Sequence, residues 1–177
     1  MPRTNRRTMS QDAAAATIDQ FKAAFRRHPA GVAVITAESA EGPVGLTASS
    51  VASVSAEPPV LVFSVTTSAG SAGSILAAST CVVHLLHSEN VDIARSFAKS
   101  GAPRFVPEQG WITRGTGEPL LPDAAVMLHC KIVDKVAVGA STLVIAEVLE
   151  IDEGVEGSPL VYHDRNFHGL QHHSILH

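Results

Sequence analysis

The chain has 177 residues, of which 45% are hydrophobic and 17% charged, a composition that fits one folded domain with a sizeable core. Thirteen basic and seventeen acidic residues give a net charge of −4, so no basic excess points to nucleic acid or an anionic membrane as the main partner. No apolar run approaches the roughly 20 residues of a membrane span, and the two cysteines form no CxxC pattern. We therefore expect a cytoplasmic protein with reduced thiols, not a disulfide scaffold.

The first 16 residues have the composition of a disordered tail, and their apolar part is too short for a good secretory signal. A helix is predicted to begin at Thr17, which can cap it, and to end before Pro29. The chain is accordingly divided into an N-terminal tail of residues 1–16, a domain of residues 17–170 and a C-terminal tail of residues 171–177.

Short runs rich in β-branched and apolar residues predict most of the remaining elements. We expect extended segments at residues 32–36, 44–55, 60–65, 81–86, 125–138, 142–151 and 160–162. Short helices are predicted at residues 74–78 and 90–100, the second capped by Asn90. Residues 102–123 form a long loop. Many strands with few, peripheral helices indicate a mainly β fold, and a β-barrel rather than a doubly wound sheet.

Residues 46–65, LTASSVASVSAEPPVLVFSV, place five hydroxyl side chains ahead of two prolines and an apolar strand. Two adjacent prolines predict a sharp turn, because neither donates to a strand ladder. Hydroxyls and free amides near a bend can hold phosphate oxygens, whereas spacing alone favours an edge strand with serines facing water. The next loop, residues 67–74, places small polar residues before a predicted helix. It is either an anion site or an ordinary flexible turn.

No GxGxxG, P-loop, HExxH or GxSxG motif is present, so a Rossmann site, an NTPase, a zincin or a serine hydrolase is not indicated. Five of the nine histidines crowd the C-terminus: His163, His168, His172, His173 and His177. Their spacing matches no standard metal site, and we expect no metal. His84 and His129 lie inside predicted strands and are expected to be structural. Residues 160–170 suit a planar heterocycle or a phosphate, or else form a surface strand.

Six segments, in their order along the chain, resemble the flavin reductase-like family, whose FMN-binding fold is a split β-barrel. The segments are FRRHPAGVAVITA, GLTASSVASVSAEPPVLVFSV, TTSAGSAGSIL, IARSFAKSG, GEPLLPDAAVMLHCKI and SPLVYHDRNFHGL. The resemblance covers about residues 21–170, and the phrase TASSxxSVSxxPP is its most specific element. The best-known members are the small reductase components of two-component flavin monooxygenases.

The resemblance implies a Greek-key type of split barrel that forms a homodimer, with FMN or FAD near the subunit interface and NADH or NADPH as co-substrate. It implies an NAD(P)H:flavin oxidoreductase that supplies reduced flavin to a separate monooxygenase. It also implies a set of cofactor-binding residues: Pro29, Gly31, Val32, Thr47, Ala48, Ser49, Ser50, Ser64, Val65, Thr67, Ser68, Ser71, Ser74, Arg165 and Phe167.

Two features depart from the family pattern. Many of these reductases carry Gly-Asp-His at the turn before the second long strand, whereas residues 139–141 here read Gly-Ala-Ser. His168 is the candidate that substitutes for this histidine, and it is the predicted catalytic residue. The loop of residues 67–74 lacks the lysine or arginine often found there. Backbone amides and hydroxyls then contribute more to phosphate binding, or Arg95, Lys99 or Arg104 supplies the missing cation.

Two alternatives to a reductase stay open at this stage. The first is a flavin-binding or electron-transfer protein without efficient NAD(P)H reductase activity, which the Gly-Ala-Ser turn favours. The second is an interaction barrel without a cofactor. Turnover of NADH or NADPH with added flavin separates a reductase from the first, and a colourless protein that does not quench FMN fluorescence would support the second.

Overall fold

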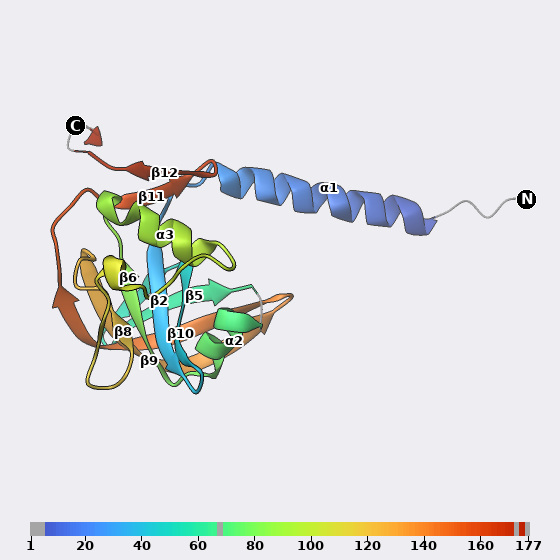
Figure 1. Ribbon diagram of the computed structural model, residues 1–177. Helices are drawn as coiled ribbons and strands as arrows, with labels where there is room; N and C mark the ends of the chain where they lie inside the picture. Colours follow the sequence, from blue (N-terminus) through green and yellow to red (C-terminus); the bar gives the residue numbers. More distant parts are fainter. Residues whose placement is uncertain (1–5, 67–68, 172–173, 176–177) are drawn as a thin grey trace, which may run out of the picture.

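A computed structural model describes residues 6–66, 69–171 and 174–175, and within them strands predominate (Figure 1). The helices are α1 (Arg6–Arg26), α2 (Gly70–Ala77) and α3 (Val91–Ala98), with the short 3-10 turns η1 (Ser88–Asn90) and η2 (Pro107–Gln109). The strands are β1 (Ala30–Gly31), β2 (Ala33–Ser39), β3 (Gly42–Ala48), β4 (Ala52–Ala56), β5 (Pro59–Val65), β6 (Thr80–Leu85), β7 (Ile112–Thr113), β8 (Pro119–Leu120), β9 (Val126–Val138), β10 (Ser141–Glu153), β11 (Leu160–His163) and β12 (Asn166–Gly169).

Seven strands form one antiparallel sheet in the order β3-β2-β6-β9-β10-β5-β4. The strands β3 and β4 are its two edges, yet only residues 49–51 separate them along the chain. Because so few residues link the two edges, the sheet curls until the edges approach each other, which makes an open barrel. The predicted mainly β split barrel with few peripheral helices is confirmed.

Two apolar clusters lie on opposite faces of β2 and β6. Ile35 and Val83 point into the barrel with Phe63, whereas Val34 and Val82 point outward to the cluster under α3. Successive residues of a strand face opposite sides, so both faces of these two strands are buried. This double burial explains why their sequences read as continuous apolar runs and not as alternating patterns.

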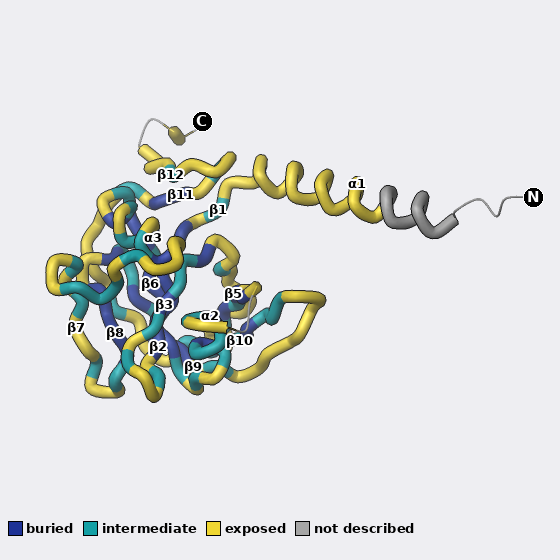
Figure 2. Tube along the Cα trace, turned by 45° about the vertical axis from the view of Figure 1, so that its right-hand side comes forward, coloured by how far each residue is buried: buried dark blue, intermediate teal, exposed yellow. Residues whose placement is uncertain are grey.

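The helix α1 extends away from the barrel, and its side chains from residue 14 onward are exposed (Figures 1 and 2). It begins at Arg6, so the predicted start at Thr17 is wrong. Four consecutive alanines at residues 13–16 are strong helix formers, and they carry the helix past the predicted cap into the predicted tail. In the part of the chain that the structure describes, no helix is long and apolar enough to span a membrane.

Two other local predictions need correction. The extended segment predicted at residues 44–55 is two strands, because residues 49–51 leave the sheet. The side chain of Asn90 does not cap α3. Its Oδ1 accepts from the backbone N–H of His87 (3.2 Å) and its Nδ2 donates to the carbonyl of Asp123 (3.2 Å), so it ties the long loop to the start of α3.

Candidate functional site

Three adjoining cavities open where β3 ends, and we name each after the helix that borders it. The α1, α2 and α3 cavities measure about 880, 640 and 690 Å³. The α1 and α3 cavities share Ser49, Tyr162 and Arg165, the α1 and α2 cavities share Ser64, and the α2 and α3 cavities share Thr47. The three therefore form one branched groove, and each branch has the size of a small-molecule site.

The hydroxyl-rich stretch forms the centre of this groove. Thr47 Oγ1 donates to the carbonyl of Ala94 (2.6 Å) and so ties β3 to α3. Ser50 Oγ accepts from the backbone N–H of Ser64 (2.9 Å) and donates to its carbonyl (3.4 Å), which joins the end of β3 to β5. Ala48 is buried in the barrel core. These bonds fix the end of β3 against α3 and β5, and the exposed Ser49 lies between the two bonded residues, where it borders the α1 and α3 cavities.

Arg104 supplies a cation to the α2 cavity. Its Nη1 donates to Ser71 Oγ (3.0 Å) and to the carbonyl of Gly45 (3.0 Å), and its Nη2 donates to the carbonyl of Lys99 (3.0 Å). The sequence left three cations open for the phosphate loop. The structure brings Arg104 to it, whereas Arg95 and Lys99 line the α3 cavity.

The loop predicted to hold phosphate contributes only in part. Ser71, in the first turn of α2, lines the α2 cavity. Ser74 lies outside that cavity, and its hydroxyl donates to the carbonyl of Gly70 (3.4 Å). Thr67 and Ser68 lie outside the described residues.

Predicted site residues around β1 and β5 also line the groove. Pro29 and Gly31 border the α1 cavity, the buried Val32 borders the α3 cavity, and Val65 borders the α2 cavity. A Cβ built on Gly31 meets no described atom within 4 Å. The space beside Gly31 is therefore open to the cavity and not filled by the protein.

The hairpin of β11 and β12 closes the groove on one side, and its turn is strained. Asp164 and Arg165 have φ of 45° and 65°, a region that non-glycine residues occupy at a cost of roughly 1–2 kcal/mol each. The backbone N–H of Asp164 donates to the carbonyl of Arg26 (3.0 Å), which anchors the turn to the end of α1. The sequence did not predict β12, because Arg165 lies at the position where such turns favour glycine.

The predicted catalytic residue His168 faces away from the groove. Phe167 contacts Tyr162 (ring centroids 5.0 Å apart) and lines the α3 cavity. His168 is exposed, contacts His163 (5.9 Å) and is absent from the lining of the three cavities. Side chains alternate along a strand, so the inward position of Phe167 turns His168 outward.

The turn at residues 139–141, which departs from the family pattern, lies near one end of the groove without lining it. Gly139 has a φ of 58°, and Thr142, just beyond the turn, pairs with Val65 of β5. Residues 139–141 are absent from the lining of the three cavities. This turn brings no histidine to the described groove.

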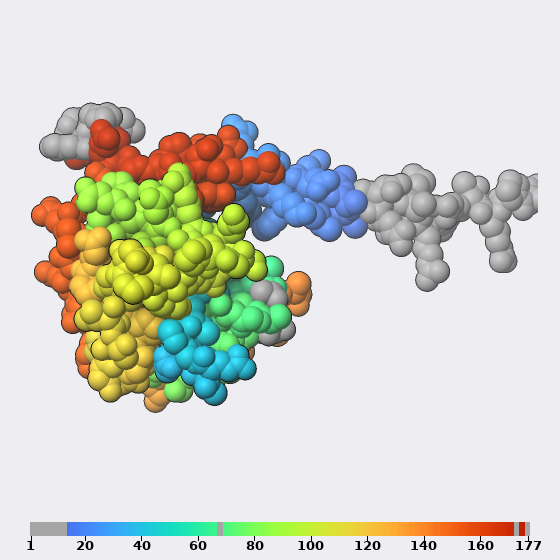
Figure 3. All heavy atoms as spheres, viewed as in Figure 1, coloured from blue at the N-terminus to red at the C-terminus, as the bar shows by residue number. Residues whose placement is uncertain are grey.

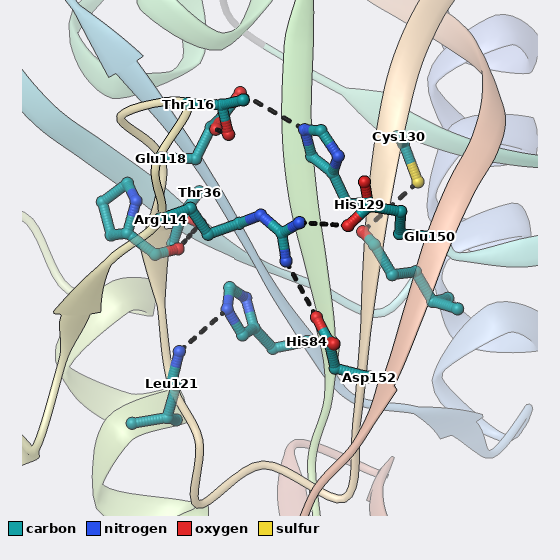
Figure 4. Close-up of polar contacts among 12 residues, drawn as sticks. Thr36, His84, Arg114, Thr116, Glu118, Leu121, His129, Cys130, Glu150 and Asp152 are labelled. Carbon is teal, nitrogen blue, oxygen red and sulfur yellow. Dashed lines mark hydrogen bonds and ion pairs between the residues drawn. The ribbon is translucent and has the colours of Figure 1, made fainter.

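A second polar group, centred on Glu118, lies inside the protein (Figure 4). Its buried carboxylate accepts hydrogen bonds from Thr80 and Thr116 and lies 3.5 Å from His129 Nε2. Burial by itself would raise the pKa of Glu118, but the hydrogen bonds from Thr116 and Thr80, a backbone hydrogen bond and the charge of His129 lower it to about 2. The carboxylate is therefore ionised and holds β8 against the sheet.

The buried His84 is structural, as predicted. Its Nδ1–H donates to the carbonyl of Val34 (3.0 Å), and its Nε2 accepts from the backbone N–H of Leu121 (3.2 Å). Burial lowers the pKa of His84 to about 4, although the bond to Val34 acts in the opposite direction. A neutral ring satisfies both contacts. His129, also predicted to be structural, is 5% exposed and belongs to the Glu118 group.

The two cysteines are direct neighbours across β6 and β9, although 48 residues separate them. Cys81 pairs with Cys130 in the strand register, and both are buried and free. The hydrogen bond with Cys130 and burial raise the pKa of the Cys81 thiol well above its ordinary value. Among the described residues, no group of three or more His, Cys, Asp or Glu side chains is arranged to hold a metal ion.

The chain matches the flavin reductase like domain over residues 25–171, and it belongs to this family. It is 39% identical over 152 residues to an NADH:FMN oxidoreductase of Rhodococcus erythropolis, covering 84% of this chain and 79% of that protein. A flavin reductase domain protein of Arthrobacter superposes with a TM-score of 0.81 at 36% identity (86% and 95% covered). The styrene monooxygenase flavin reductase of Pseudomonas putida S12 superposes with a TM-score of 0.76 at 26% identity (85% and 97% covered).

Proposed function

We propose that this protein is an NAD(P)H-dependent flavin reductase that binds FMN or FAD in the groove and supplies reduced flavin to a separate monooxygenase. The observation that carries the proposal is the branched groove around the TASS stretch, with Arg104 and Ser71 at one end and the hairpin aromatics at the other. The membership in the flavin reductase family and the Rhodococcus and Pseudomonas relatives support it.

The groove fits a flavin, because it combines an anion-binding end with an open, partly apolar wall. Four of the five N–H groups of Arg104 have protein partners in the described chain, and the fifth is left for a phosphate oxygen. The open space beside Gly31 admits a flat ring. The residues that we propose to bind the flavin are Pro29, Gly31, Val32, Thr47, Ser49, Ser50, Ser64, Val65, Ser71 and Arg104. Contacts from Ala48, Thr67, Ser68 and Ser74 stay predictions.

When bound, the flavin supplies the ring that accepts hydride from the nicotinamide and carries the electron pair. The contribution of the chain is binding, orientation and exclusion of water. Arg104 and Ser71 hold one end of the ligand, and Val32 and Val65 exclude water beside it. Arg165 and Phe167 border the side on which we propose that the nicotinamide binds. Hydride transfer itself requires no acid or base, which agrees with a groove that His168 does not line.

The proposal includes a homodimer in a reducing, cytoplasmic compartment. Large apolar side chains are exposed on the strands β4, β9 and β10, where they would be covered by a second copy: Val54, Val133, Val136, Val138, Leu149 and Ile151. The free cysteines support the compartment. Light scattering after size exclusion checks the dimer, and a monomer at micromolar concentration would contradict it.

A paired assay on the purified full chain tests the function. FMN and FAD are titrated by fluorescence quenching, and oxidation of NADH and NADPH is then followed by absorbance with the tighter flavin present. We expect saturable binding and turnover with at least one nucleotide. Absence of binding would contradict the proposal as a whole.

A flavin-binding or electron-transfer protein without efficient reductase activity is the second candidate. The position of His168 outside the groove and the Gly-Ala-Ser turn at residues 139–141 favour it. Flavin binding without turnover of either nucleotide, in the same assay, would establish this candidate in place of the reductase.

A further inference from the structure

The turn that carries Arg104, residues 103–106, is held by a side-chain amide that lies outside the groove. This Arg104 turn begins the long loop after α3, and Figure 3 shows the segment in yellow-green at the surface beside α2. Gln109 follows in the short turn η2 and is absent from the lining of the α1, α2 and α3 cavities. Any effect of Gln109 on a bound flavin must therefore pass through a neighbouring residue.

The amide of Gln109 binds both ends of the Arg104 turn. Its Oε1 accepts from the backbone N–H of Val106 (3.4 Å), and its Nε2 donates to the carbonyl of Pro103 (3.3 Å). The same Nε2 also donates to Ser96 Oγ of α3 (3.5 Å). A side-chain amide has two donors and two acceptor lone pairs, so one residue can close the turn and tie it to α3 at the same time.

Aromatic packing fixes the same turn. Phe105 has a φ of 55°, a left-handed conformation that bulky side chains rarely adopt. Its ring packs edge-on against Phe97 (centroids 5.0 Å apart) and Trp111 (5.2 Å). Nε1–H of Trp111 in turn donates to Oε1 of Gln109 (3.0 Å). Strained backbone persists where surrounding contacts over-determine it, so the contacts of Phe105 and Gln109 hold the turn in one conformation.

This conformation directs the side chain of Arg104 past α3 to the α2 cavity. Nε donates to the carbonyl of Ser96 (3.3 Å), and the guanidinium lies 5.5 Å from the ring centroid of Phe97. Nη1 donates to Ser71 Oγ and to the carbonyl of Gly45 (both 3.0 Å). A long side chain loses rotamer freedom when a ligand orders it. Here the contacts of the protein itself order the guanidinium, so less of this freedom is lost on binding.

We infer that Gln109 is a positioning residue for Arg104, because its amide holds the turn that directs the guanidinium into the α2 cavity. Gln109 itself lies outside the groove and acts through Arg104. This inference rests on the proposed function, in which Arg104 binds the phosphate of the flavin, and deepens it. Recognition of the phosphate, and not of the flavin ring, should therefore depend on the amide of Gln109.

Two flavins that differ by the phosphate alone, FMN and riboflavin, test this role on the purified full chain. Gln109→Met keeps the length of the side chain and removes its hydrogen bonds, and Gln109→Ala removes the side chain beyond Cβ. Glu108→Gln, a change to the exposed neighbour in η2, is the matched control. Both flavins are titrated by fluorescence quenching at one fixed salt concentration, and melting temperatures confirm folding.

Gln109→Met and Gln109→Ala should each raise the dissociation constant for FMN about threefold to tenfold, because Arg104 is then ordered only when the phosphate binds. The constant for riboflavin should stay within about twofold, and the Glu108 control should change neither constant. In an Arg104→Ala background, the same Gln109 substitutions should weaken FMN binding by less than about twofold more. A residue that merely supports the fold would instead lower the affinity for both flavins.

Unchanged FMN affinity in the two Gln109 variants would overturn the inference. An equal loss of riboflavin affinity, or a loss that adds fully to that of Arg104→Ala, would also overturn it, because Gln109 would then act on the fold and not through Arg104. Failure of the proposed function has a different signature, since the wild-type chain itself would then quench neither FMN nor riboflavin.

Discussion

The two polar regions of the barrel differ in where their hydrogen-bonding groups point. In the buried group, Glu118 accepts from two threonine hydroxyls, and both ring nitrogens of His84 are bonded to the backbone. In the groove, Ser49 and Arg165 are exposed and border shared cavities. Polar groups that satisfy each other inside the protein hold the fold together, whereas polar groups that converge on open space are available to a ligand. Substitutions in the first region should change stability, and substitutions in the second should change binding.

The largest expected effect comes from the buried region. Glu118→Ala should lower the free energy of unfolding by about 3 kcal/mol, because it leaves His129 and two threonine hydroxyls without their buried partner. Urea denaturation measures this change. Glu150→Ala is the matched control, because its carboxylate is 62% exposed beside Arg114 and should contribute less than about 1 kcal/mol. Equal destabilisation by the two variants would contradict the difference between buried and exposed carboxylates, and FMN affinity should be retained in both.

The next effect depends on pH. The pKa of His84 is about 4 in the folded protein against 6.5 for the free side chain, so the unfolded chain binds more protons between these values. The neutral, buried His84 therefore contributes to the free energy of unfolding, and this contribution is fully present above pH 6.5. As the pH falls towards 4, the contribution of about 3 kcal/mol is lost. Unfolding free energies of the wild type and His84→Gln from pH 7 to 4 test this. Parallel pH profiles would show that His84 does not cause the loss.

Substitution of Arg104 in the groove should have a smaller effect, which is limited to ligands that carry a phosphate. Arg104→Ala should weaken FMN binding about tenfold, because a charged hydrogen bond to phosphate is lost. Binding of riboflavin, which has no phosphate, should change little, and Arg104→Lys should recover part of the FMN affinity. Fluorescence titration of both ligands is the measurement. An equal loss of riboflavin affinity would mean that Arg104 acts by positioning Gly45 and Lys99, whose carbonyls it binds.

The smallest effect should come from filling the open space beside β1. Gly31→Val should weaken flavin binding a few-fold and leave the melting temperature nearly unchanged, because an added Cβ meets no described atom within 4 Å. Gly154→Ala is the opposite case, since its Cβ would lie 1.9 Å from the carbonyl oxygen of Ala124 and force the backbone to move. That variant should melt at a lower temperature. Loss of stability in Gly31→Val without loss of binding would remove Gly31 from the site.

Local sequence signals were enough to predict the elements that depend on near neighbours. The strands predicted at residues 60–65 and 81–86 match β5 and β6 to within one residue at each end, because β-branched runs next to turn residues are local signals. The order of the segments around residues 46–65 also determined the fold class and the family. Thr47, Ser49 and Ser50 of this stretch each line part of the groove, but the sequence did not predict the bonds of Thr47 to α3 and of Ser50 to β5.

Contacts between residues that are far apart in the chain could not be predicted in this way. Arg104 binds Ser71, which lies 33 positions earlier in the chain. Asn90 binds the loop at Asp123 and does not cap its own helix, and His168 points out of the groove. No local pattern encodes these outcomes. Each follows from how the curled sheet and its packed helices place segments that are far apart in the chain, and from the requirement that polar groups buried by that packing find partners.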